Sequence, residues 1–213
     1  MELLSDELTH YLENSCEPEN ELLKHINRET HLKVSMPRML SGHYQGRLLS
    51  MISKMISPQR ILEIGTFTGY ATLCLAEGLR ENGIIHTIDI NVELEDMVRS
   101  NFKKSDLDSK IIYQIGDAKE IIPTLNETFD LVFIDADKEN YIHYYTMIVP
   151  MMNKGGIILS DNVLWSGKVL EPLQKNDLST KILLEYNQLL KNDPRVETVL
   201  LPIRDGLTVS RVL

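Results

Sequence analysis

The chain has few cysteines, few bases relative to acids, and no long apolar run. Only Cys16 and Cys74 are cysteines among the 213 residues, too few for a disulfide framework or a four-sulfur metal site. No stretch of about 18 apolar residues occurs, so we expect no membrane-spanning helix. The first residues lack the basic and apolar segments of a signal peptide. These absences predict a cytoplasmic protein.

The shortage of bases bears on the binding partner. Lys and Arg number 22 against 31 Asp and Glu, which gives a net charge of −9. Nucleic-acid binders usually present a basic face to phosphates. The charge argues against a dedicated nucleic-acid binder, although a local basic patch is compatible with it. The length and the hydrophobic content of 43% predict one globular domain over residues 1–213.

Residues 1–57 have the spacing of amphipathic helices, which predicts a helical N-terminal cap. A third helix is expected from His43 to Ile56, ending before Pro58. Apolar residues at helical intervals in the first two helices are Leu3, Leu4, Leu8, Leu12, Leu22, Leu23 and Ile26. Those predicted to face inward in the third are Leu48, Leu49, Ile52, Met55 and Ile56.

Residues 58–213 alternate short apolar runs with helical spacing, which predicts an α/β core. The alternation is typical of a doubly wound, mostly parallel sheet of the Rossmann-like kind. The last two strands are close enough in sequence to form an antiparallel hairpin at one edge. The expected strands are 60–64, 84–89, 111–115, 129–134, 157–160, 196–201 and 206–213. The expected helices are 70–80, 92–102, 118–125, 141–152 and 178–190.

The loop after the first expected strand contains two glycines in the spacing Gly-x-x-x-Gly. Dinucleotide enzymes have Gly-x-Gly-x-x-Gly instead. Gly65 lets the backbone approach a ligand, and Gly69 opens the next helix. A tight strand-to-helix turn without a ligand explains the same pattern.

Acids follow the next two strands as well. Asp89 comes roughly 20 residues beyond the loop, where a carboxylate accepts ribose hydroxyls, and Asp117 and Ala118 lie where an adenine could be contacted. Asp89 and Asp117 could instead be helix N-caps. Three such loops in order favour a nucleoside-containing cofactor.

Three oxygen-bearing side chains, those of Asp135, Asp161 and Asn162, follow the fourth and fifth expected strands. Oxygen ligands without His or Cys suit Mg²⁺. The alternative is that these residues are surface acids and helix caps. Lys138, three residues after Asp135, could lean over the same site and accept a proton from a hydroxyl, or it could be a solvated lysine paired with Glu139 or Asp137.

Four segments together resemble the cation-dependent catechol and caffeoyl-coenzyme A O-methyltransferases, most closely the caffeoyl-coenzyme A branch with its bacterial members. The similarity extends from about Met36 to Val212. The segments are LEIGTFTGY (62–70), FIDADKENY (133–141), DNVLWSG (161–167) and LPIRDGL (201–207).

The resemblance implies roles for individual residues. S-adenosylmethionine would be bound through its methionine part by Glu63, Gly65 and Thr66, and through its ribose by Asp89. Further cofactor positions are Met39, Ser41, Gly69, Ala71, Asp117, Ala118 and Asp135. The metal ligands would be Asp135, Asp161 and Asn162, holding Mg²⁺ or another divalent cation such as Mn²⁺ or Ca²⁺. Lys138 would be catalytic, and Ser166 would contact substrate.

Two positions depart from the family pattern. A serine usually follows Gly-Tyr, and Ala71 removes its hydroxyl, so that one cofactor hydrogen bond is missing or is supplied by Thr72. Where Arg204 stands the branch often has glycine, and a cation facing the substrate would alter preference.

The expected reaction is methylation of a catechol-like or caffeoyl-type hydroxyl on a small phenolic molecule. The resemblance also implies a homodimer, for which the apolar residues near Met36 to Met55 offer a surface. Three alternatives stay open. They are a methyltransferase for a hydroxylated nucleoside in tRNA, a nicotinamide oxidoreductase that the glycine spacing disfavours, and an inactive binding module.

Overall fold

The computed structural model describes residues 5–213 and divides them into two compact units, residues 5–118 and residues 119–213. Leu3 and Leu4 of the expected first helix lie outside the described residues. No helix in the described part of the chain is both long and apolar enough to cross a membrane. The expectation of a single domain stays a prediction.

The first unit begins with helices, as the spacing of apolar residues predicts. Two of them start at side-chain caps, where Ser5 accepts a hydrogen bond from the backbone N–H of Leu8 and Asn20 accepts one from Leu23. Pro37 opens the short 3₁₀ helix between the second and third α-helices. These elements are α1 (Asp6–Asn14), α2 (Glu21–Lys33), η1 (Pro37–Met39) and α3 (Gly42–Ile56).

The inner face of α3 differs from the expected one at its C-terminal end. Leu49 and Ile52 are buried as expected, but Met55 is 72% exposed, so its assignment to the inner face is wrong. Ser53 faces inward instead, and its hydroxyl donates to the backbone oxygen of Leu75 at 2.6 Å. The apolar spacing did not reveal this face because a small polar residue occupies it.

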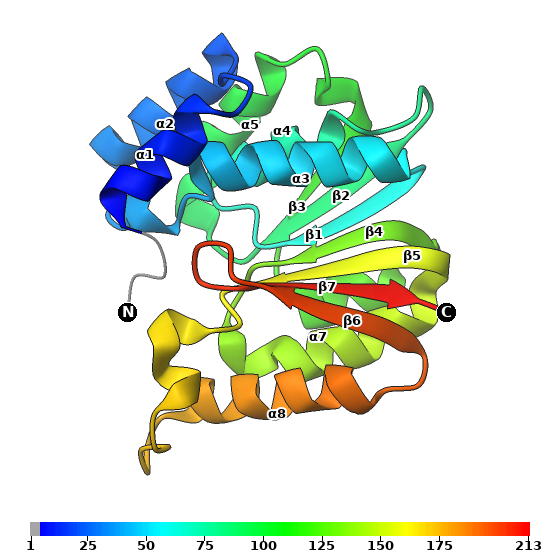
Figure 1. The fold of residues 1–213 in the computed structure, drawn as a ribbon. Coiled ribbons are helices and arrows are strands. Elements are labelled where there is room, and N and C mark those ends of the chain that lie inside the picture. Colours follow the sequence, from blue (N-terminus) through cyan, green and yellow to red (C-terminus); the bar gives the residue numbers. More distant parts are fainter. Residues whose placement is uncertain (1–4) are drawn as a thin grey trace. The chain divides into compact units, whose positions relative to one another are not determined.

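Three parallel strands form the sheet of the first unit in the order β3-β2-β1 (Figure 1). They match the expected strands residue for residue. The strands are β1 (Arg60–Ile64), β2 (Ile84–Asp89) and β3 (Ile111–Ile115). The connecting segments contain α4 (Tyr70–Ala76), η2 (Val92–Leu94), α5 (Glu95–Lys103) and η3 (Asp108–Lys110).

Helix α4 ends at Ala76, four residues before the expected end at Arg80. The chain tightens there, because the N–H groups of Gly78 and Leu79 bond to carbonyls three residues back. A Cβ atom at Gly78 would lie 2.2 Å from the backbone carbon of Ser53. The close approach of α3 therefore requires glycine here, and glycine disfavours continuation of the helix.

The second unit has four strands in the order β4-β5-β7-β6. Parallel pairing joins β4 to β5, and antiparallel pairing joins β5 to β7 and β7 to β6. The strands are β4 (Phe129–Ile134), β5 (Met152–Asp161), β6 (Val196–Leu201) and β7 (Leu207–Val212). The α/β class, the parallel strands, the antiparallel C-terminal pair and the N-terminal helices are thus confirmed.

Helices α7 (Tyr141–Ile148) and α8 (Leu178–Asn192) lie side by side in this unit (Figure 1). The rings of Tyr141 and Tyr145 both meet the ring of Tyr186 edge to face. These tyrosines fill the interior between the helices with apolar ring surface, while each hydroxyl reaches a polar partner.

Proline shortens two of the expected helices. The expected helix 141–152 stops at Ile148, and Pro150 lies in the 3₁₀ turn η6 (Val149–Met151) that follows. Strand β5 then begins at Met152, five residues earlier than expected, because Met152 pairs with Phe129 ahead of a bulge. Likewise α6 (Ala118–Ile121) gives way to η4 (Ile122–Thr124), which contains Pro123.

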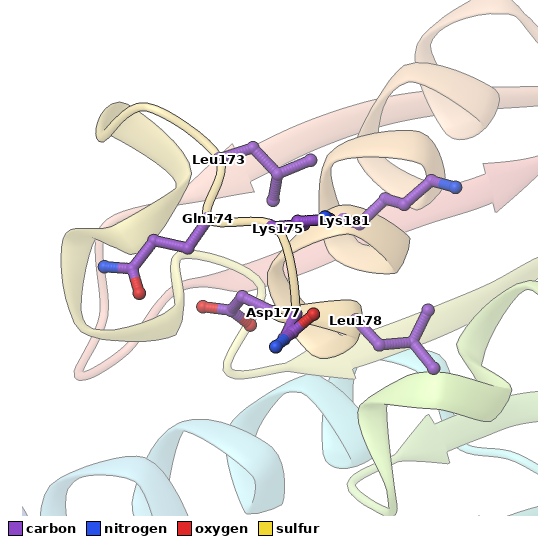
Figure 2. A pocket seen from close by; sticks show the side chains of 7 residues that line it. Leu173, Gln174, Lys175, Asp177, Leu178 and Lys181 are labelled. Carbon is purple, nitrogen blue, oxygen red and sulfur yellow. The ribbon is translucent and has the colours of Figure 1, made fainter.

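Two open cavities lie beside α8. One of about 280 Å³ is formed by the loop before the helix and its first turns, including Lys175, Asp177 and Lys181 (Figure 2). The other, about 300 Å³, is lined by Asn187 and Thr208 among others. Neither is lined by a residue that the sequence assigns to the site.

Candidate functional site

The glycine loop after β1 has a backbone that only small residues adopt easily. Gly65 and Gly69 have φ angles of 103° and 83°, and Gly69 is the N-cap of α4. A Cβ atom at Gly69 would lie 2.5 Å from a ring carbon of Phe102. The loop is tied to the sheet by the N–H of Gly65, which donates to the carbonyl of Ile88 at 2.9 Å. Its glycines are therefore required by the turn itself.

The carboxylate of Asp89, the last residue of β2, fastens the same loop. It accepts hydrogen bonds from the backbone N–H of Phe67 at 2.6 Å and from that of Asn91 at 2.8 Å. The N-cap of the next helical turn is Asn91, whose side chain accepts from Glu93. Asp89 is thus not that cap. Its two oxygens retain lone pairs for further donors such as ribose hydroxyls.

Beneath the loop, Glu63 is fully buried at the carboxyl end of β1. One carboxylate oxygen accepts hydrogen bonds from the hydroxyls of Thr72 and Thr87, the latter at 2.5 Å. The hydroxyls of Thr66 and Thr87 also lie 2.6 Å apart. Helix α4, strand β2 and the loop therefore meet at one buried carboxylate. That negative charge would suit the ammonium group of an amino-acid ligand.

These contacts bear on the departure at Ala71. Thr72 is buried and its hydroxyl donates to Glu63, so its proton is already committed inside the protein. A hydroxyl has only one proton to donate. The structure therefore favours the first alternative, in which the hydrogen bond of the usual serine is missing.

The remaining cofactor positions of the first unit lie in different elements. Met39 in η1 is exposed, and Ser41 is buried just before α3. Asp117 follows β3, and the buried Ala118 is the first residue of α6. Contacts of these residues with a nucleoside stay a prediction.

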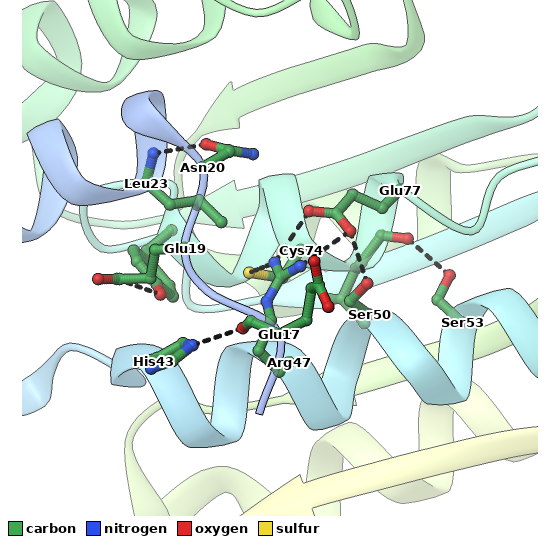
Figure 3. Close-up of polar contacts among 12 residues, drawn as sticks. Glu17, Glu19, Asn20, Leu23, His43, Arg47, Ser50, Ser53, Cys74 and Glu77 are labelled. Atoms are coloured by element: carbon green, nitrogen blue, oxygen red, sulfur yellow. Dashed lines mark hydrogen bonds and ion pairs between the residues drawn. The ribbon is translucent and has the colours of Figure 1, made fainter. Parts of the chain in front are cut away.

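A cluster of charged side chains fixes α4, the helix that follows the loop, to α3 (Figure 3). Glu77 accepts hydrogen bonds from both terminal nitrogens of Arg47, from Ser50 at 2.6 Å and from Lys54 at 2.8 Å. These donors lower the pKa of Glu77 to about 2 against the opposing effect of burial. Nearby, burial raises the pKa of the Cys74 thiol to about 12, so this cysteine is an unreactive packing residue.

In the second unit, the parallel pairing of β4 with β5 brings the predicted metal ligands together. Ile134 and Ser160 are partners in the sheet, so Asp135 and Asp161 follow them at the same end of neighbouring strands. Asn162 comes next, in a left-handed conformation with φ 57°. Its N–H donates to the carboxylate of Asp161 at 2.8 Å, and Asp161 is buried.

Lys138 lies among these ligands rather than in solvent. Its ammonium donates to Asn162 Oδ1 at 2.9 Å and to Asp135 Oδ1 at 3.3 Å. Only 7% of its side chain is exposed. The alternative of a solvated lysine paired with Glu139 or Asp137 is therefore wrong.

The same contacts test whether the residues suit a cation. A positive group, the ammonium, is already held by oxygens of two of the three predicted ligands. No cluster of three or more His, Cys, Asp or Glu side chains suited to a metal occurs between residues 5 and 213. The predicted set has two carboxylates and one amide, a donor combination that proteins use for hard cations. These side chains fit a divalent cation.

Tyr141 was not assigned a role from the sequence, although it stands in the same segment. Its hydroxyl is 2.6 Å from the ammonium of Lys138, 2.8 Å from the backbone oxygen of Asp161 and 3.2 Å from that of Ile134. The residue is fully buried. A tyrosine three residues after a lysine, at the start of a helix, is the only sequence signal for this contact.

Ser166 lies in a strained loop, η7 (Trp165–Leu170), with φ 55°. Its N–H donates to the carboxylate of Asp205, and the N–H of Leu164 donates to the backbone oxygen of Asp205 at 2.9 Å. Arg204 also has a positive φ, 49°, a conformation that glycine adopts more easily than arginine. Ser166 is exposed, and its contact with substrate stays a prediction.

Comparison with protein families identifies the chain. The sequence model described as O-methyltransferase matches residues 12–213. The chain belongs to the O-methyltransferase family. The predictions of an enzyme and of a methyltransferase are thereby confirmed.

Curated relatives cover nearly the whole of this O-methyltransferase. Caffeoyl-CoA O-methyltransferase from Medicago sativa is 36% identical over 225 residues, which span 98% of this chain and 90% of the relative. Caffeoyl-CoA O-methyltransferase 1 from Eucalyptus globulus is 37% identical, with 98% and 89% covered. The resemblance to the caffeoyl-coenzyme A branch is confirmed.

Solved structures agree with the fold of the O-methyltransferase. An O-methyltransferase from Bacillus cereus in complex with SAH has a TM-score of 0.89 and 27% identity, and the match covers 96% of both chains. TomG from Streptomyces achromogenes, in complex with SAM, has a TM-score of 0.87 and 26% identity over 95% of this chain and 94% of TomG. The Rossmann-like methyltransferase fold is confirmed.

Proposed function

We propose that this O-methyltransferase transfers a methyl group from S-adenosylmethionine to one hydroxyl of a catechol-like or caffeoyl-type small molecule, with a divalent cation such as Mg²⁺. The observation that carries the proposal is the ammonium of Lys138 held between Asn162 and Asp135, because these oxygens already accommodate a cation. Caffeoyl-CoA methyltransferases among the relatives support the acceptor class. The SAM and SAH complexes of similar structures support the cofactor.

The first unit offers the residues for the cofactor. Gly65 and Thr66 would receive its methionine part, with the buried carboxylate of Glu63 close to the loop. Asp89 would accept the ribose hydroxyls with lone pairs that its two backbone donors leave open. Asp117 and Ala118 would border the adenine.

The second unit offers the residues for the acceptor. Asp135, Asp161 and Asn162 would hold the cation. When bound, the cation stabilises the negative charge of a phenolate, and the cofactor supplies an electrophilic methyl group. Lys138, as the neutral amine that is left after its ammonium releases a proton to solvent, would take the proton of the acceptor hydroxyl at Nζ, and Ser166 would contact the acceptor. A preorganised site stabilises the changing charges more effectively than bulk water.

Exposed apolar side chains in the N-terminal region support a homodimer as part of the proposal. Met36, Met39, Met51 and Met55 are each at least 45% exposed, and methionine is enriched at protein–protein interfaces. Light scattering should give twice the mass of one chain. A monomer at micromolar concentration would remove this part of the proposal.

A methyl-transfer assay tests the function. Radiolabelled cofactor would be incubated with a panel of catechols, with caffeoyl esters and with bulk tRNA, each with Mg²⁺ or with EDTA. We expect transfer to catechols and caffeoyl esters only when Mg²⁺ is present, and no transfer by Asp135→Ala, because the loss of one ligand costs several kcal/mol. The matched control is Asp137→Asn at a neighbouring exposed acid. Transfer to tRNA alone, or full activity in EDTA, would contradict the proposal.

A further inference from the structure

The buried hydroxyl of Tyr141 joins three parts of the second unit at one point. It contacts the ammonium of Lys138 in η5 (Lys138–Asn140), the backbone oxygen of Asp161 at the end of β5 and that of Ile134 at the end of β4. The hydroxyl has one proton, which it donates to the oxygen of Asp161 at 2.8 Å, and it accepts from Lys138 at 2.6 Å.

The ammonium of Lys138 contacts three side chains. Two of them, Asp135 and Asn162, are proposed ligands of the cation, and the third, Tyr141, is not. A side-chain oxygen that turns toward a dication has less capacity to hold an ammonium. Tyr141 is the one of the three that takes no part in holding the cation, so its contact is the one that stays available to Lys138.

We infer that Tyr141 is a positioning residue that keeps the amine of Lys138 at the site when the cation takes over Asp135 and Asn162. The inference rests on the proposed function of those two side chains. Hydrogen bonding and the face of the ring act together, because the ammonium also lies 4.6 Å from the centre of the Tyr141 ring.

The phenol is suited to this role because one hydroxyl can accept and donate at the same time. It accepts from Lys138 while it donates to the backbone oxygen of Asp161. Tyr141 therefore holds the amine through an oxygen whose own proton is committed to the backbone.

The substitution Tyr141→Phe removes only the hydroxyl and keeps the ring among its neighbours. The matched control is Tyr186→Phe, because Tyr186 is equally buried, packs against Tyr141 with ring centres 5.4 Å apart, and directs its hydroxyl to Ser160 rather than to Lys138. Thermal unfolding of both variants measures what each lost hydroxyl does to the fold alone.

The first readout does not depend on the acceptor. Acetylation of Lys138 by acetic anhydride, followed by mass spectrometry in the presence of Mg²⁺, reports how freely the amine moves out of its buried position. We expect labelling about fivefold to tenfold faster in Tyr141→Phe and unchanged in Tyr186→Phe. Equal labelling in Tyr141→Phe and the wild type would overturn the inference, even if the protein methylated no catechol.

The second readout is a double-mutant cycle with Lys138→Met. We expect Tyr141→Phe to lower kcat about tenfold in the wild type and to lower it no further when Lys138 is absent, with the KM for S-adenosylmethionine unchanged. An equal loss in both backgrounds would show a purely structural role. Loss of Mg²⁺ affinity in calorimetry, to the same extent as kcat, would show that the hydroxyl acts through Asp161 instead, and would also overturn the inference.

Discussion

The glycine loop of the first unit and the strand ends of the second unit both gather carboxylates, but different groups hold them. Glu63 and Asp89 receive hydrogen bonds from threonine hydroxyls and backbone N–H groups, all of them neutral. Asp135 is contacted instead by an ammonium, that of Lys138. Neutral donors fix the orientation of a carboxylate without neutralising its charge. A cationic side chain neutralises that charge, and another cation can displace it.

This difference distinguishes the carboxylates that support the fold from the one whose cationic partner can be exchanged. The acids of the loop are needed for its backbone conformation, so their substitution should affect folding and cofactor affinity together. At the strand ends of the second unit, Asp135 holds an exchangeable charge, the ammonium of Lys138. Its substitution should change catalysis and cation binding more than stability.

We expect the largest effect on catalysis from removal of Lys138. Because Lys138 is the cationic partner of Asp135, this variant tests the comparison most directly. We expect Lys138→Met to lower kcat by about 10²–10⁴-fold, because acid–base assistance of that size is lost. The affinity for Mg²⁺ should stay equal or increase, because the ammonium no longer occupies Asp135 and Asn162. Steady-state kinetics and calorimetry measure the two quantities.

The control for this variant is Lys154→Met, at an exposed lysine on β5. It should leave both quantities unchanged. A weaker affinity for Mg²⁺ in Lys138→Met would mean that the lysine supports the cation rather than competes with it. The contrast between the two groups of acids would then fail.

Substitution of Asp89, whose carboxylate fastens the glycine loop, tests the first unit's part of the comparison. We expect Asp89→Asn to weaken S-adenosylmethionine binding about tenfold, because charge-assisted hydrogen bonds to the ribose are lost. Calorimetry with S-adenosylhomocysteine measures the affinity, and Asp106→Asn at an exposed loop position is the control. Unchanged affinity would leave Asp89 with only the structural role that its bonds to Phe67 and Asn91 show.

The sequence predicted the strands of the first unit to the residue, because each is a short apolar run bounded by clear turn residues. It failed where a tertiary contact decided the boundary. Helix α4 ends early because α3 approaches Gly78, and β5 starts early because Met152 finds a partner in Phe129. Neither partner is near in sequence, so local spacing could not indicate them.

The same limit of local spacing explains why the sequence predicted only part of the candidate site. Position after a strand brought Asp135 and Asn162 to one place, and the structure joins them through Lys138. Tyr141 was missed, because its hydroxyl turns toward backbone oxygens at the ends of two strands. The buried hydroxyls around Glu63 were missed likewise, since Thr72 and Thr87 come from different elements.

Acid should weaken the cluster around Glu77 that joins α4 to α3. Glu77 has a folded-state pKa of about 2, below its ordinary value of 4.5. Its contribution to the free energy of unfolding is therefore fully present above pH 4.5 and is lost as the pH falls toward 2. Glu77→Gln should lower the free energy of unfolding by about 2–3 kcal/mol at pH 7.

Chemical denaturation between pH 3 and pH 7 measures this effect. The difference between wild type and Glu77→Gln should shrink toward the acid end, and Glu93→Gln at an exposed site should show no such trend. A difference that is constant with pH would show that Glu77 does not carry its charge into the folded state.

Two glycines with positive φ separate the cost of backbone strain from the cost of a packing clash. At Gly42 a Cβ atom would meet nothing within 4 Å, whereas at Gly69 it would meet the ring of Phe102 at 2.5 Å. Gly42→Ala should cost about 1 kcal/mol of unfolding free energy for the left-handed backbone alone. Gly69→Ala should cost about 1–2 kcal/mol more. Equal costs in thermal unfolding would mean that Phe102 moves aside freely.

Direct counting of bound divalent cations tests the central claim. Mn²⁺ in place of Mg²⁺ can be followed by electron paramagnetic resonance as it binds to the protein with S-adenosylhomocysteine present. We expect one bound ion per chain in the wild type and in Lys138→Met, and none at the same concentration in Asp135→Ala, Asp161→Ala or Asn162→Ala. One ion bound with undiminished affinity in all three alanine variants would contradict that claim.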